Sequence, residues 1–149
     1  HRVDRRQRQM CIRDRFVTAI LGHYNTITDE ISWVNGGHQP ALLRDKNGKF
    51  EQVESAAPPM GVIQQKNKSL YEINRTKLNG KRFYAFTDGL SESLDSKGNE
   101  IGIEGSIKII EKNFNDDVSK QLSNIAKDVE KSFGKNKLSD DLTLIAIGK

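Results

Sequence analysis

Alternating apolar and polar residues dominate the first part of the chain and predict β-strands. Two Asn-Gly pairs, at 47–48 and 79–80, are typical of tight hairpin turns between strands. Short connections of this kind usually join strands that run antiparallel, so we expect a simple antiparallel meander. The expected strands are residues 16–24, 31–35, 41–44, 50–53, 70–78 and 82–86.

Beyond residue 100 the apolar positions change to helical spacing and predict two helices. Their apolar positions are Ile103, Ile107, Ile110 and Phe114 in the first, and Val118, Leu122, Ile125, Val129 and Phe133 in the second. Residues 142–147 (LTLIAI) then predict a last strand. Strands followed by helices and a closing strand are typical of an α+β fold.

The net charge of +4 comes entirely from residues 1–15, which hold six arginines and two aspartates. One interpretation is a basic arm that binds nucleic acid or anionic lipid. This segment lacks aromatic residues for base stacking, however, and the stretch RQRQMCIRDR resembles translated sequencing-adapter sequence. We therefore expect residues 1–15 to be a foreign or artefactual extension, with the chain cut just before Phe16. The domain itself then comprises residues 16–149.

Carboxylates at strand ends are the remaining candidates for chemistry, because the chain has no P-loop, G-x-S-x-G or H-E-x-x-H motif. Asp88 follows the strand at 82–86, and Asp140 and Asp141 precede the strand at 142–147. If these strands are antiparallel neighbours, the carboxylates meet at one edge of the sheet. Oxygen ligands of this kind suit Mn²⁺ or Mg²⁺. The competing interpretation is that these aspartates are ordinary turn residues.

His38 also has two interpretations. Its unperturbed pKa, about 6.5, would suit a general acid near a phosphate. The alternative, which we favour, is that it fixes the loop after Gly36-Gly37 by hydrogen bonding.

Five segments, in this order, resemble the PPM-type protein serine/threonine phosphatases, in the SpoIIE-like branch found in bacteria. They cover nearly all of residues 16–149, and Gly36 and Met60 are departures from the usual alanine and leucine. The segments are FVT at 16–18, WVNGGHQPALL at 33–43, PPMGV at 58–62, FTDGLSES at 86–93 and SDDLTL at 139–144.

The resemblance implies the C-terminal part of a PPM-phosphatase β-sandwich flanked by helices. It also implies metal-dependent hydrolysis of phosphoserine or phosphothreonine on a partner protein, through water activated by a two-metal Mn²⁺ or Mg²⁺ centre. Asp88 and Asp140 match the family's metal-binding aspartates in T-D-G and D-D-x-T-L. Asp141 stands where relatives have Asp or Asn, so we expect it beside the ligands rather than on the metal.

The family's N-terminal acidic motifs, G-G-D-x-x-D and G-D-V-x-G-x-G, are missing from the sequence. We therefore expect this chain alone to be inactive and its full-length parent to be a phosphatase. The alternative is a non-catalytic protein-interaction module that retains the fold.

By resemblance, the partner is a phosphorylated protein such as an anti-sigma-factor antagonist. An upstream sensor domain is expected in the parent. We expect no nucleic-acid partner, and no membrane contact for this segment. The expected location is the cytoplasm, with the parent anchored to the membrane in some cases through upstream domains.

Overall fold

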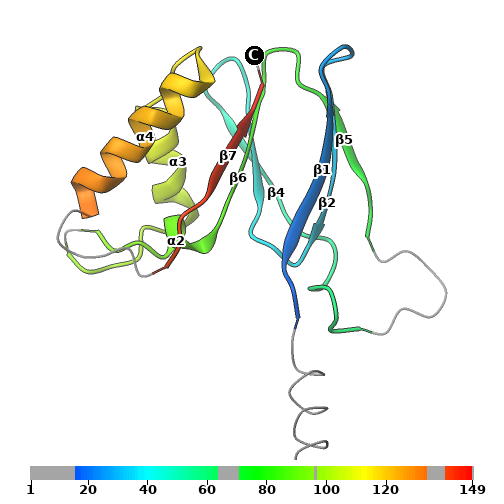
Figure 1. Cartoon of the computed structure of the whole chain (residues 1–149), viewed down its shortest axis with the longest axis horizontal. Helices are drawn as coiled ribbons and strands as arrows, with labels where there is room; N and C mark the ends of the chain where they lie inside the picture. The colour runs from blue at the N-terminus through cyan, green and yellow to red at the C-terminus, as the bar shows by residue number, and fades with distance from the viewer. Residues whose placement is uncertain (1–15, 64–70, 96, 134–139, 149) are drawn as a thin grey trace, which may run out of the picture. The chain divides into compact units, whose positions relative to one another are not determined.

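The computed structural model describes residues 16–63, 71–95, 97–133 and 140–148, so the arginine-rich segment at 1–15 lies outside the described residues. The chain folds as two compact units (Figure 1). Among the described residues, one unit lies within the ranges 16–40 and 54–77, and the other lies within the ranges 41–53 and 78–148. The mixture of antiparallel sheets and helices confirms the α+β prediction.

The first unit holds a three-stranded antiparallel sheet in the order β1-β2-β5. Its strands are β1 (Ala19–Asn25), β2 (Glu30–Gly36) and β5 (Asn74–Lys77). The buried side chains of Ile31 and Trp33 alternate along β2 with half-exposed neighbours, as expected for a strand with one covered face. Val17, which we expected within the first strand, pairs instead with Met60 through two backbone hydrogen bonds of 2.9 and 2.8 Å.

The second unit holds a four-stranded antiparallel sheet in the order β4-β3-β6-β7. Its strands are β3 (Ala41–Arg44), β4 (Phe50–Val53), β6 (Arg82–Phe86) and β7 (Leu144–Ile147). β3, β4 and β6 coincide with the predicted strands. The meander prediction is wrong, because β5 pairs with β2 and β6 pairs with β3. Local alternation shows that a segment is extended but does not determine which strand it pairs with.

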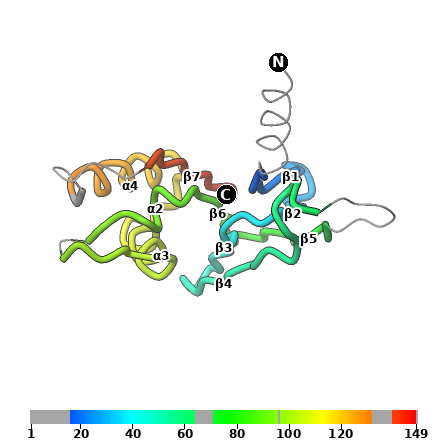
Figure 2. The backbone as a smooth tube through the Cα atoms, turned by 90° about the horizontal axis from the view of Figure 1, so that it is seen from below, coloured from blue at the N-terminus to red at the C-terminus, as the bar shows by residue number. Residues whose placement is uncertain are grey.

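Two long helices, α3 (Gly102–Lys112) and α4 (Val118–Phe133), cover one face of the four-stranded sheet (Figures 1 and 2). A single apolar core lies between them and the sheet: Leu42, Tyr84, Phe86, Leu90, Ile110, Ile125 and Val129. No helix in the described ranges is long and apolar enough to cross a membrane.

Phe114 lies beyond the end of α3, which corrects our prediction that it belongs to the helix. Its ring lies under the guanidinium of Arg44, 3.5 Å from the ring centroid, and within 5.1 Å of Arg82. Arg44 in turn makes two hydrogen bonds of 2.7 and 3.0 Å to Glu111. A cation over an aromatic face and a bidentate ion pair together hold this end of α3 against β3.

A buried polar network joins β6 to the segment between α3 and α4. The guanidinium of Arg82 donates to the carbonyl oxygens of Asn115 and Asp116, and to Oε1 of Gln121 at 2.6 Å. Gln121 Oε1 also accepts from the hydroxyl of Tyr84 at 3.1 Å, and its amide nitrogen donates to the carbonyl of Ile110. Because buried polar groups are costly unless paired, this network holds the first part of β6 against α4 and the segment before it.

The Lys112–Asp128 ion pair links α3 to α4 and predicts a small effect of pH on stability. The Lys112 ammonium and the amide of Asn113 lower the pKa of Asp128 in the folded state. Because the pKa of Asp128 is lower in the folded than in the unfolded state, its ionised carboxylate stabilises the fold at any pH above the unfolded-state pKa. This stabilisation is lost as the pH falls through the folded-state pKa. Lys112 is 67% exposed, so we expect Asp128→Asn to cost less than about 1 kcal/mol at pH 7.

The measurement is urea unfolding of the wild type and Asp128→Asn at pH 7 and pH 3, with Glu130→Gln on the same helix as control. The difference between wild type and Asp128→Asn should shrink at pH 3, below the ordinary aspartate pKa of about 4. A difference that grows at pH 3 would contradict the assignment.

Candidate metal centre

The end of β6 and the start of β7 lie side by side, as the predicted convergence of carboxylates requires. The last pair of the ladder is Phe86 with Leu144, and the backbone N–H of Thr87 then donates to the carbonyl of Thr143 at 3.0 Å. Figure 1 shows the chain before β7 passing beside the short helix α2 (Asp88–Ser91). The backbone segments that carry Asp88 and Asp140 therefore meet at one edge of the sheet.

Thr87 joins the two segments through its side chain. Its Oγ1 donates to the carbonyl of Asp141 at 2.9 Å and accepts from the N–H of Thr143 at 2.9 Å. The N–H of Asp141 donates to Oδ1 of the neighbouring Asp140 at 2.7 Å. The peptide groups of Asp141 thus connect the Thr87 hydroxyl to the Asp140 carboxylate.

Gly89 allows the two segments to approach each other this closely. A Cβ at this position would lie 2.6 Å from the carbonyl oxygen of Asp141 and 3.1 Å from that of Asp140. Distances below 3.0 Å do not occur for real Cβ atoms, so no larger residue fits without movement of the backbone at 140–141. The glycine after Asp88 therefore has a packing role that its turn-like sequence did not indicate.

Asp88 is the first residue of α2, a helix of one turn that the sequence analysis described only as a turn. The side chains of Asp88, Asp140 and Asp141 are all exposed. Exposed carboxylate oxygens at one edge fit the donor chemistry of Mn²⁺ or Mg²⁺. In the part of the chain that the structure describes, no group of three or more His, Cys, Asp or Glu side chains could hold an ion. Asp88 and Asp140 would therefore supply only part of a ligand set, and their role as ligands stays a prediction.

His38 lies in the first unit, and its contacts are to neighbouring residues of the same loop. Its backbone N–H donates to Oδ1 of the buried Asn35 at 2.9 Å, and its Nδ1 lies 3.4 Å from the carbonyl oxygen of Gln39. Asn35 Nδ2 closes the loop by donating to the Gln39 carbonyl, and Ser55 Oγ accepts from the N–H of Gly37. The loop is therefore held mainly by the side chains of Asn35 and Ser55, and the imidazole of His38 adds one contact, to the adjacent residue. Sequence reasoning missed Asn35 and Ser55, although an asparagine directly before Gly-Gly is a plausible turn-forming residue.

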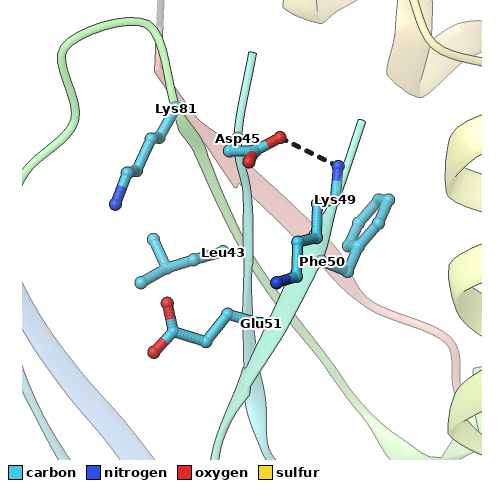
Figure 3. Close-up of a pocket in the computed structure, with 6 residues that line it drawn as sticks. All are labelled: Leu43, Asp45, Lys49, Phe50, Glu51 and Lys81. Atoms are coloured by element: carbon cyan, nitrogen blue, oxygen red, sulfur yellow. Dashed lines mark hydrogen bonds between the residues drawn. The ribbon is translucent and has the colours of Figure 1, made fainter. Parts of the chain in front are cut away.

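A separate cavity of about 290 Å³ lies in the second unit, at the opposite end of β6 from Asp88 (Figure 3). The residues that line it are Leu43, Asp45, Lys49, Phe50, Glu51 and Lys81. Asp45 is held in its turn by the N–H groups of Asn47 and Lys49, which donate to its Oδ1 at 2.8 and 2.9 Å. The lining contains two ammonium groups and two carboxylates, so it has no excess charge of either sign. Lys81 precedes β6 and Asp88 follows it, which separates this cavity from the candidate metal centre.

Comparison with known proteins identifies the family. The family model described as Stage II sporulation protein E (SpoIIE) matches residues 1–149. Protein IcfG of Synechocystis sp. is 22% identical over 133 residues, which is 89% of this chain and 20% of IcfG.

Two solved structures show the same fold. The SiaA-PP2C domain of Pseudomonas aeruginosa matches with a TM-score of 0.72 and 14% identity, over 89% of this chain and 51% of that domain. The phosphatase domain of the cell fate determinant SpoIIE from Bacillus subtilis, presoaked with Mn, matches with a TM-score of 0.62 and 15% identity, over 87% of this chain and 55% of that one. The chain thus spans about a fifth of the curated relative and about half of these domains. It belongs to the SpoIIE family, and its fold matches part of a PP2C-type, or PPM-type, phosphatase domain.

Proposed function

We propose that a protein containing this chain within a complete SpoIIE-type domain hydrolyses phosphoserine or phosphothreonine on a partner protein. Asp88 and Asp140 are the proposed ligands of Mn²⁺ or Mg²⁺. The observation that carries the proposal is the pairing of β6 with β7, which brings two aspartates more than fifty residues apart in sequence to one sheet edge. Membership of a phosphatase family and the Mn-soaked SpoIIE domain support the same conclusion.

Divalent ions at such a site lower the pKa of bound water and neutralise charge on the phosphoryl oxygens. The chain's own contribution is to orient the carboxylates. Asp140 Oδ1 accepts the N–H of Asp141, which leaves its other oxygen for a ligand bond. Asp88 presents an exposed carboxylate from the first residue of α2, directly after the end of β6.

We further propose that residues 16–149 alone are a poor catalyst. Mn²⁺ and Mg²⁺ take about six oxygen ligands, several of them water, so a stable two-metal centre needs more protein carboxylates than two. The described part of the chain offers two proposed ligands, and the chain matches only 51% and 55% of the two phosphatase domains.

The test is hydrolysis of a phosphoserine peptide in the presence of Mn²⁺, comparing this chain with a longer polypeptide that contains it in a complete phosphatase domain. We expect turnover by the longer polypeptide and little by this chain. Substantial turnover by this chain would contradict the proposed division of ligands. Absence of Mn²⁺-dependent turnover in the longer polypeptide would contradict the phosphatase proposal.

The proposed substrate is a phosphorylated anti-sigma-factor antagonist. The phosphatase is proposed to act in the cytoplasm, under the control of an upstream sensor domain. This choice follows from the family resemblance. Incubating the longer polypeptide with candidate phosphoproteins of this class and measuring phosphate release would test it. Release of phosphate from unrelated phosphopeptides at the same rate would argue against this substrate class.

A further inference from the structure

We propose that Thr87 is a positioning residue for the two aspartates, acting through its hydroxyl group on the backbone of Asp141. This inference rests on the proposed metal centre, because it assigns Thr87 the task of fixing Asp140 relative to Asp88. The hydroxyl bonds directly from the Asp88 segment to the Asp140–Thr143 segment.

The direction of each hydrogen bond determines what the hydroxyl does. Oγ1 accepts from the N–H of Thr143 and donates to the carbonyl of Asp141, so both sides of the hydroxyl are used. A hydroxyl that both donates and accepts has one favoured orientation, which fixes the chain at residues 141–143 relative to Thr87.

The same contact reaches the Asp140 carboxylate through one residue. The Asp141 N–H donates to Asp140 Oδ1 at 2.7 Å, while the Asp141 carbonyl accepts from Thr87. Thr87 therefore fixes Asp141 through its carbonyl group, and Asp141 in turn holds the carboxylate of Asp140 through its N–H group. Within the described part of the chain, the Asp141 carboxylate itself takes no part in this arrangement, since only the backbone atoms of Asp141 bond to Thr87 and Asp140.

Valine is the variant that removes the hydroxyl while keeping the shape of threonine. Partners that orient metal ligands typically account for about 10–100-fold in metal affinity, so we expect Thr87→Val to weaken Mn²⁺ binding by about tenfold. Thr87→Ser retains the hydroxyl and should bind Mn²⁺ within about twofold of wild type. Thr143→Val is the matched control, because the contacts of Thr143 to Thr87 use only its backbone atoms.

Two measurements on the longer polypeptide separate the possible failures. The first is Mn²⁺ affinity by calorimetric titration, and the second is amide hydrogen exchange at Thr143, whose N–H bonds to Thr87. We expect Thr87→Val to speed exchange at Thr143 and to weaken Mn²⁺ binding, with both restored in Thr87→Ser.

Faster exchange with unchanged Mn²⁺ affinity would overturn the positioning role while leaving the metal centre intact. Unchanged exchange would show that the hydroxyl contact does not hold the segment, and would overturn the inference at its first step. If the wild-type polypeptide binds no Mn²⁺, the proposed function fails, and the positioning role fails with it. Loss of affinity in Thr87→Val and Thr87→Ser alike would indicate disturbed packing rather than a missing hydroxyl, and would also overturn the inference.

Discussion

Gly89→Ala is expected to destabilise the second unit by about 2–3 kcal/mol and to weaken any Mn²⁺ binding at the same time. The added Cβ would lie 2.6 Å from the carbonyl oxygen of Asp141, and this neighbour is backbone rather than a flexible side chain. The segment at 140–141 must therefore move away from Asp88. That movement lengthens the hydrogen bond from Thr87 to Asp141 and separates the two proposed ligands.

The measurements for Gly89→Ala are urea unfolding and Mn²⁺ titration. Gly22→Ala is the control, because a Cβ on Gly22 in β1 would meet its nearest neighbours at 3.4 Å. Alanine in a strand interior is itself more favourable than glycine by roughly 0.5–1 kcal/mol, so the control should be neutral or slightly stabilising. A Gly89→Ala protein as stable as the wild type would show that the close approach at Asp141 is not a real constraint.

Asp88→Asn and Asp140→Asn are each expected to lower the Mn²⁺ affinity of the longer polypeptide by at least about 100-fold. Even the outer partners of metal ligands account for about 10–100-fold, and these two residues are the proposed ligands themselves. Loss of a negative charge also removes direct attraction to the ion. Turnover of a phosphoserine peptide should fall in parallel, because the proposed hydrolysis would use water activated by the ion that these residues would hold.

Asp116→Asn is the matched control for these variants. Asp116 is also exposed in the second unit, and its backbone carbonyl rather than its carboxylate accepts from Arg82. Its removal should leave Mn²⁺ affinity unchanged. Equal losses in Asp116→Asn and Asp88→Asn would indicate a general charge effect, and would remove the support for specific ligands. Titration of the folded proteins and a check of their unfolding curves separate loss of a ligand from loss of the fold.

Elements with strong local patterns were predictable from the sequence. β3, β4 and β6 have the predicted bounds, because a short apolar run between turn residues leaves few other possibilities. α4 likewise begins at Val118 as its spacing predicts. The one-turn helix α2 was not predictable, because four residues are too few to show a helical period.

Pairing between distant strands was the least predictable part of the fold. β2 pairs with β5 and β3 pairs with β6, and both pairings join residues roughly forty positions apart. The sequence left open whether the strands at 82–86 and 142–147 are neighbours, and the antiparallel pairing of β6 with β7 meets the condition on which the candidate site depends. Two further features complete this edge: the backbone of Asp141 bonds to Thr87, and Gly89, which has no Cβ, lets the backbone of Asp141 approach closely. Backbone atoms are common to every residue, so no sequence pattern could reveal the contacts made by Asp141.

The pairing of β6 with β7 also has a consequence for biosynthesis. Thr87 is translated 56 positions before Thr143, its hydrogen-bonding partner in the sheet. At about 5–20 residues per second, β6 emerges from the ribosome roughly 3–11 seconds before the strand that covers its edge. During that interval the RFYAF edge is open to pairing with other nascent chains. Slowing translation between residues 90 and 140 should therefore increase aggregation of the newly made protein, and early binding of a chaperone to this strand should reduce it.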